Sequence, residues 1–183
     1  MNNEMESLLR ERINRVAYTH IIHEKNADII NFWIGVLKWT QIIISAAITC
    51  ELFGLFFSNE CSLKIVAVVS SFILTSITMI TKNLGLDQKA EKHKTYAARY
   101  LNLKDSLIAL LADAKGMSLN DSDVAKRRDE LQKEYDELNE HAPRTCSRAY
   151  SKAEKTIEEG MRTANDSVTD TFLPEKLRIV NTK

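Results

Sequence analysis

The chain has little that bends or cross-links a polypeptide. Its 183 residues include five glycines, two prolines and three cysteines. Because glycine and proline punctuate turns, their scarcity predicts long helices, and no strand-like alternation occurs outside the apolar middle. Cys50, Cys61 and Cys146 form no CxxC pair. We therefore expect unpaired thiols and neither a zinc site nor a redox motif.

The chain also lacks an excess of charge and the common catalytic motifs. The 25 basic and 25 acidic side chains give a net charge of zero, which excludes a general nucleic-acid binder, so direct binding of a DNA or RNA duplex is not expected. No phosphate loop, GxGxxG, HExxH or GxSxG element occurs. His20 and His23 with Glu24 have no evident third ligand for a metal. We expect no enzyme, no metal and no cofactor.

Two long apolar runs fill the middle of the sequence. They read WTQIIISAAITCELFGLFF over residues 39–57 and LKIVAVVSSFILTSITMIT over residues 63–81. Each is close to the roughly 20 residues that a helix needs to cross a bilayer. From Trp39 to Thr81 the charged residues are only Glu51, Glu60 and Lys64. The pattern predicts two membrane spans and disfavours a soluble helical hairpin.

Basic residues flank the hairpin on one side. Five precede the first run, four follow the second, and Lys64 alone lies at the edge of the intervening loop: Arg10, Arg12, Arg15, Lys25, Lys38, Lys82, Lys89, Lys92 and Lys94. Cytoplasmic flanks of membrane spans are enriched in Lys and Arg. Both termini are therefore expected in the cytoplasm.

Polar residues recur at helical spacing within both runs. Small polar residues allow close helix packing, whereas a polar stripe on several assembled hairpins could line a pathway. Glu51 and Gln41 favour the second interpretation, because polar groups at membrane depth are costly and usually face a cavity or a partner. The candidate pore or span-interface residues are Gln41, Ser45, Thr49, Glu51, Ser71, Thr75 and Thr78.

Heptad spacing outside the apolar runs predicts further helices. A seam from Leu9 to Ile34 predicts one helix running from about residue 4 into the first span. A second seam predicts that the second span continues as helix to about Ala114. Two more helices are expected, at 123–140 with Leu131, Tyr135 and Leu138 inward, and at 145–159 with Tyr150, Ala153 and Ile157 on one side.

The expected fold is therefore an all-α membrane protein, in which a two-span transmembrane helical hairpin is continuous with a cytoplasmic helical bundle. The expected organisation is a cytoplasmic N-terminal helix at 1–38, the hairpin at 39–81 with its outer loop near 58–62, the cytoplasmic bundle at 82–160 and a C-terminal tail at 161–183.

Basic side chains share one face of the last expected helix. A solvated surface is the usual outcome of such a pattern. The alternative is a recess for a phosphate-bearing ligand, because arginine can form bidentate hydrogen bonds with phosphate. A second basic cluster, Lys126, Arg127 and Arg128, lies at the start of the preceding expected helix. The nucleotide-binding candidates are Arg144, Arg148 and Lys152.

Three segments resemble a known family. They read YTHIIHEKNADIINFW, DQKAEKHKTYAARYLNLKDSLIALL and LQKEYDELNEHAPRTCSRAYSKAE. In their order around a two-span hairpin they resemble the SLATT family, the SMODS and SLOG-associating two-transmembrane effector domains, from about Tyr18 to about Ile157. The resemblance is carried by Glu91, His93, Tyr100, Leu101, Tyr135, Leu138 and Ala142-Pro143.

The resemblance implies a bacterial inner-membrane effector of anti-phage defence. Such an effector would oligomerise and permeabilise the membrane under control of a nucleotide second messenger, causing growth arrest or cell death. The implied partners are membrane lipid, further copies of the chain, and a cyclic or linear oligonucleotide made by a neighbouring synthase. A single hairpin encloses no lumen, so a pore requires a homo-oligomer.

Two other functions stay open. One is a membrane-anchored scaffold or sensor that recruits a partner protein, with the tail FLPEKLRIVNTK as its docking segment. The other is a small ion channel unrelated to defence. A toxic isolated chain would disfavour the scaffold, and a neighbouring nucleotidyltransferase gene would disfavour the unrelated channel.

Overall fold

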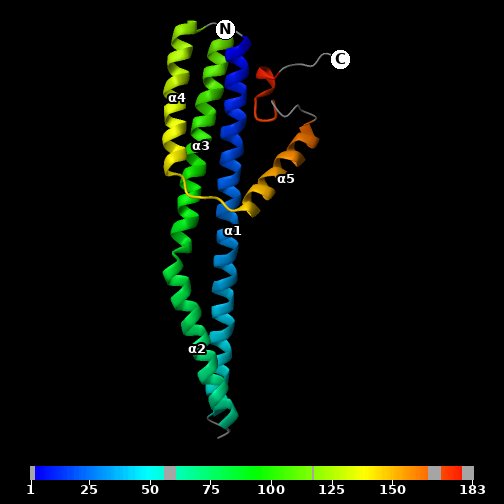
Figure 1. Cartoon of the computed structure of the whole chain (residues 1–183). Coiled ribbons are helices and arrows are strands. Elements are labelled where there is room, and N and C mark those ends of the chain that lie inside the picture. Colours follow the sequence, from blue (N-terminus) through cyan, green and yellow to red (C-terminus); the bar gives the residue numbers. More distant parts are fainter. Residues whose placement is uncertain (1–2, 56–60, 117, 165–169, 179–183) are drawn as a thin grey trace. The chain divides into compact units, whose positions relative to one another are not determined.

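The structure is a computed structural model that describes residues 3–55, 61–116, 118–164 and 170–178 (Figure 1). Over these residues the chain is helical and contains no strand, which confirms the all-α class. The elements are α1 Asn3–Leu55, α2 Cys61–Leu84, α3 Leu86–Lys115, α4 Asp121–His141, α5 Ser147–Ala164 and the 3₁₀ helix η1 Glu175–Leu177. Of the outer loop expected near 58–62, residues 58–60 lie outside the described residues and the remainder begins α2.

Helix α1 runs unbroken for 53 residues. It therefore joins the heptad seam and the first apolar run in one element, as the sequence predicts. The prediction that the second span continues as one helix to about Ala114 is wrong at one point. Helix α2 ends at Leu84 and α3 begins at Leu86. Gly85 between them has φ +56°, in the left-handed region that costs side-chain-bearing residues steric strain. Glycine at this position permits the break.

The chain forms two compact units, residues 28–91 and residues 1–27 with 92–183. The hairpin unit, residues 28–91, contains α2 and the C-terminal part of α1. Two helices of the described chain hold an 18-residue window apolar enough to cross a membrane, and 6% of each window is buried. A core helix of a soluble protein would be mostly buried. The exposed aliphatic surface thus fits lipid as its surroundings.

The bundle unit, residues 1–27 with 92–183, has a conventional core. Figure 1 shows α4 lying alongside α3 and the first part of α1. The core residues come from all three helices and from the C-terminal segment: Leu9, Ile13, Val16, Tyr96, Tyr100, Leu103, Leu107, Leu110, Leu111, Ala114, Val124, Leu131, Tyr135, Leu138 and Leu173. The expected inward positions of α4, Leu131, Tyr135 and Leu138, are confirmed.

Helix α4 begins and ends where local chemistry predicts. Asn120 precedes it with extended backbone, and Asp121 and Asp123 place negative charge in its first turn, where the helix dipole favours it. At the other end Ala142 is extended, with φ −63° and ψ 139°. The residue before a proline avoids the helical region, so Pro143 sets this end.

Helix α5 departs from its expected orientation. Ala149, Ala153 and Ile157 are buried, but Tyr150 is 53% exposed. The Tyr150 ring instead makes an edge contact with Tyr18 of α1, with centroids 5.2 Å apart. Small alanine side chains therefore form the buried face of α5, and a tyrosine at that face would hold the helices apart.

Candidate functional site

A polar groove runs between α1 and α2 in the hairpin unit. Its cavity volume is about 660 Å³, and it is lined by Lys38, Gln41, Ile42, Ser45, Ala46, Thr49, Leu74 and Thr78. Four of the seven candidate residues thus share one groove: Gln41, Ser45, Thr49 and Thr78. Lys38 Nζ lies 3.7 Å from Asp87 Oδ1, an exposed pair that contributes little to stability.

The two threonine hydroxyl groups of the groove are satisfied within their own helices. Thr49 donates to the Ser45 carbonyl at 2.9 Å, and Thr78 donates to the Leu74 carbonyl at 2.8 Å. Such hydroxyls can lie at membrane depth without a cross-helix partner, and each oxygen keeps a lone pair for water or an ion. The groove is therefore chemically suited to a hydrated surface inside an assembly.

The other hairpin candidates lie outside the groove lining. Ser71 donates to the Ala67 carbonyl and Thr75 to the Ser71 carbonyl, both at 2.8 Å. Glu51 is half-buried in the single chain. Its Oε2 atom is buried and accepts no hydrogen bond from any of the described residues. A buried carboxylate oxygen in this state is costly, so Glu51 is suited to a donor or water supplied by an assembly.

The nucleotide-binding candidates Arg144, Arg148 and Lys152 are exposed. None of them lines the hairpin groove or either of two cavities in the bundle unit. Sequence reasoning placed them on one helical face but could not provide a concave partner for that face.

A different cleft with an excess of basic residues lies between α1, α3 and α4, and of its arginines the sequence pointed only to Arg128. It has a volume of about 300 Å³, and its lining includes Leu9 and Leu107, the guanidinium groups of Arg12, Arg15 and Arg128, and the carboxylates of Glu11 and Asp129. Arg15 pairs with Glu11 and Arg128 with Asp129. The Arg12 guanidinium lies over the Tyr135 ring, 4.9 Å from its centroid. The cleft combines an apolar wall with cationic groups, which suits a flat, phosphate-bearing molecule.

A buried polar cluster joins α1 to α3 in the bundle unit. His23 Nδ1 and His93 Nδ1 are 3.0 Å apart, and Asn26 Nδ2 is 2.7 Å from His93 Nε2. Burial, with lesser effects of His93 and His20, lowers the pKa of His23 to about 4. Burial and Lys92 also lower the pKa of His93. Both lowered pKa values favour neutral rings near pH 7. The described residues contain no group of three potential metal ligands.

Tyr100 extends this cluster toward α4. Its ring stacks near His23, with centroids 5.5 Å apart, and its hydroxyl donates to Asn139 Oδ1 at 2.8 Å. Burial raises the pKa of Tyr100 to about 12, with further contributions from Tyr135 and Tyr96. The tyrosine therefore stays a neutral donor that links three helices.

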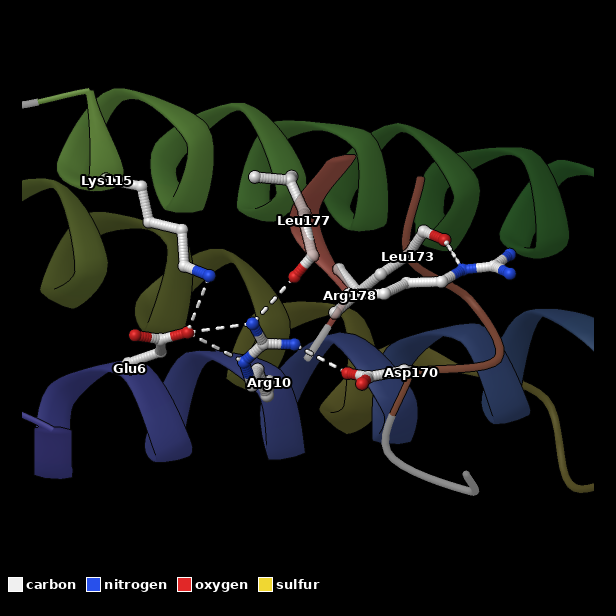
Figure 2. A network of polar contacts seen from close by, with 7 residues as sticks. All are labelled: Glu6, Arg10, Lys115, Asp170, Leu173, Leu177 and Arg178. Carbon is white, nitrogen blue, oxygen red and sulfur yellow. Dashed lines mark hydrogen bonds and ion pairs between the residues drawn. The ribbon is translucent and has the colours of Figure 1, made fainter. Parts of the chain in front are cut away.

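A second buried network fixes the C-terminal segment to α1 (Figure 2). Arg10 is 2% exposed and donates from Nη1 to Asp170 Oδ1 at 2.6 Å. Its Nε and Nη2 atoms donate to Glu6 Oε1, and Nη2 also donates to the Leu177 carbonyl at 2.7 Å. Lys115 at the end of α3 pairs with the same Glu6 oxygen at 2.9 Å.

The charges of this network stabilise one another. Burial alone would raise the pKa of Glu6, but the hydrogen bonds and charges of Lys115 and Arg10 outweigh it and lower the pKa below its ordinary value. The ion pair between Arg10 and Asp170 is buried on both sides. Because Glu6 also binds the guanidinium, loss of the Asp170 charge should cost about 1.5–3 kcal/mol, the usual contribution of a hydrogen bond to a charged group.

The expected tail at 161–183 thus needs correction in two places. Helix α5 extends to Ala164, and residues 170–178 pack against the bundle, with Leu173 2% exposed. Residues 165–169 and 179–183 of that tail lie outside the described residues. The sequence contained no indication of this docking, since Arg10 and Asp170 are 160 positions apart.

Comparison with known proteins gives one match. The family model described as "SMODS and SLOG-associating 2TM effector domain family 4" matches residues 5–166. No curated protein and no solved structure matches the chain. The matched range covers both apolar helices and α3 to α5, and it ends before the segment that bonds to Arg10.

Proposed function

We infer that this chain, which belongs to the SLATT family of two-transmembrane effector domains, is a bacterial anti-phage effector that oligomerises in the inner membrane and permeabilises it. A nucleotide second messenger controls this activity, and the result is growth arrest or cell death. Both termini and the bundle unit lie in the cytoplasm, and residues 39–81 form the two spans.

The polar groove of the hairpin carries this proposal. Its lining includes Gln41, Ser45, Thr49 and Thr78, whereas the surrounding hairpin surface is apolar and exposed. Lipid can cover the apolar surface without a cost in free energy. The polar side chains of a groove that faces lipid would lose their hydrogen bonds to water. Hairpins that turn their grooves toward a common axis remove that cost and create a hydrated pathway. Glu51 would gain polar surroundings in the same assembly.

Messenger control is proposed for the bundle unit. The cleft containing Arg12, Arg15 and Arg128 offers a concave cationic surface, whereas Arg144, Arg148 and Lys152 offer an exposed one. We favour the cleft as the site of a nucleotide, because concave sites bury more of a small ligand. The partner that makes the messenger is a synthase encoded beside this chain.

Induction in bacteria tests the proposal. The chain is induced alone and then with its neighbouring synthase, while membrane potential and uptake of an impermeant dye are followed. Depolarisation in at least one arrangement supports an effector, and the arrangement that leaks gives the sign of messenger control. An intact membrane in both arrangements would favour the anchored scaffold instead.

A further inference from the structure

The C-terminal residues Asp170–Arg178, here called the strap, are held to the bundle at two kinds of contact. The first is polar, because Arg10 binds both the Asp170 carboxylate and the Leu177 carbonyl. The second is apolar, because Leu173 joins the core cluster, with Phe172 and Leu177 partly buried against it. Figure 2 shows the polar contacts of Asp170 and Leu177 meeting at Arg10 in the first turns of α1.

The strap is less firmly built than the helices beneath it. Its only regular element is the three-residue helix η1, and its own backbone bonds are local, from Leu173 to Asp170 and from Leu177 to Pro174. Leu173 is its single fully buried apolar side chain. Segments with few buried contacts open at a lower free energy than a helical core. The strap can therefore detach while the bundle stays folded.

Detachment leaves Arg10 with a partner. Glu6 binds the guanidinium at 2.7 and 3.0 Å within α1 itself, and Lys115 also contacts Glu6. The vacated site would hold the two cations Arg10 and Lys115 against the single carboxylate of Glu6, beside the space left by Leu173. Such a site is suited to an acidic residue followed three positions later by leucine, which is the strap's own pattern.

We propose that the Arg10 site binds an acidic, leucine-containing peptide segment, and that the strap occupies it in the resting state as an autoinhibitory contact. This inference rests on the proposed permeabilising function. Arg10 lies between the core residues Leu9 and Ile13 on α1, the unbroken helix that also contributes Gln41, Ser45 and Thr49 to the polar groove. Releasing the strap alters the packing of α1 in the bundle and favours the permeabilising assembly.

The first test is Asp170→Asn in the full-length chain in lipid nanodiscs and in cells. The substitution keeps the shape of the side chain but removes its charge. We expect hydrogen exchange across the strap to rise by roughly ten- to a hundredfold, the equivalent of one lost charge-assisted hydrogen bond. We also expect dye uptake in cells lacking the synthase to rise, with the helical content unchanged.

A matched control is Glu11→Gln. Glu11 pairs with Arg15 on the same helix at 2.8 Å, but both side chains are exposed. This variant loses a carboxylate without touching the strap, so exchange and dye uptake should stay at wild-type values. Leu173→Ala supplies a second release, because it removes the strap's one fully buried apolar side chain from the bundle core and leaves the polar contacts of Arg10 in place. It keeps the inference testable if Asp170→Asn lowers helical content.

Binding in trans tests the chemistry of the site. A synthetic peptide with the sequence TDTFLPEKLR, residues 169–178, is labelled and titrated onto the Asp170→Asn protein. We expect saturable binding and suppression of dye release from vesicles containing that protein. The same peptide with asparagine in place of the aspartate should bind roughly tenfold or more weakly.

Three results would overturn the inference: no peptide binding, equal binding of both peptides, or strap release that leaves permeabilisation at the wild-type level in cells where the synthase does activate the chain. A wild-type chain that never permeabilises a membrane, with or without its synthase, refutes the proposed function and with it the autoinhibitory role. Peptide binding would still report separately on the Arg10 site.

Discussion

The Nδ1 atoms of His23 and His93 face each other at 3.0 Å in the buried part of the bundle. Asn26 fixes the proton between them. Its Oδ1 accepts the Cys146 N–H at 3.1 Å, so its amide nitrogen donates to His93 Nε2 at 2.7 Å. His93 must then carry its proton on Nδ1 and donate it to His23. Both rings are neutral in this arrangement. A proton added to His23 Nδ1 would place two N–H donors against each other.

This pair predicts that the bundle loses stability in mild acid. The folded pKa of His23 is about 4, below the ordinary value of 6.5. Between these values the unfolded chain binds more protons, so the contribution is present above pH 6.5 and is lost as pH falls toward 4. The full shift corresponds to about 3 kcal/mol, of which about 2 kcal/mol is lost between pH 7 and pH 5. Chemical unfolding in detergent micelles at pH 7 and pH 5, followed by circular dichroism, measures it.

Two variants separate this effect from general acid sensitivity. His23→Gln should flatten the dependence of unfolding free energy on pH, because the buried titrating group is gone. His141→Gln removes an exposed histidine and should leave the dependence unchanged. Equal slopes for wild type and His23→Gln would contradict the assignment.

The break between α2 and α3 predicts a residue-specific cost at Gly85. Gly85→Ala should lower the free energy of unfolding by about 1–2 kcal/mol, since φ +56° strains any residue with a Cβ. The cost is conformational, because the nearest atom to a new Cβ would be Gln88 Oε1 at 3.5 Å. Gly35→Ala is the control: its site is helical and open, so stability should stay the same or rise. Equal losses in both variants would argue against strain at Gly85.

The polar groove predicts different effects for two threonines of α1. Thr49 lines the groove, whereas Thr40 lies outside its lining, and each donates to the carbonyl four residues earlier. Thr49→Leu should reduce ion leakage severalfold without preventing membrane insertion, and Thr40→Leu should not. Glu51→Ala should also reduce leakage. Dye uptake per inserted chain is the measurement, and unchanged leakage in Thr49→Leu and Glu51→Ala would remove the groove as a pathway.

The native cysteines predict a labelling pattern for the membrane orientation. Cys61 at the start of α2 and Cys146 before α5 are both exposed free thiols. In variants that retain one of them, a membrane-impermeant maleimide on intact cells should label Cys61 and spare Cys146. After the cells are opened, both should react. Labelling of Cys146 in intact cells would place the bundle outside and refute the proposed orientation.

The two basic sites predict different responses to the messenger. Arg12→Ala should weaken binding of the synthase product by about tenfold or more, since Arg12 lies in the cleft. Arg148→Ala removes the same charge from an exposed helix face and should change binding little. The measurement is calorimetric titration of the purified chain with the product. If Arg148→Ala weakened binding more than Arg12→Ala, the nucleotide site would instead lie at Arg144, Arg148 and Lys152.

Local patterns in the sequence predicted most of the helical architecture. Heptad spacing predicted α1 and the inward face of α4, because a buried face repeats every three or four residues. Polar spacing also identified residues that meet in one groove, Gln41, Ser45, Thr49 and Thr78. The break at Gly85 was missed because an isolated glycine inside a helical pattern is usually tolerated.

Long-range pairings could not be predicted in the same way. The bond between Arg10 and Asp170 joins residues 160 positions apart, and nothing in either local pattern specifies the other. Tyr150 was misplaced because hydrophobicity alone does not decide which residues a helix buries: α5 buries Ala149 and Ala153 and leaves Tyr150 largely exposed. The basic cleft was missed because it draws on three separate helices.

Reconstitution tests the central claim most directly. The purified chain is placed in sealed lipid vesicles containing a trapped dye, and release is followed before and after adding the product of the neighbouring synthase. We expect release in at least one of these states, with a slower rate for Thr49→Leu. Vesicles that stay sealed in both states, although the chain is inserted and oligomeric, would contradict a permeabilising function.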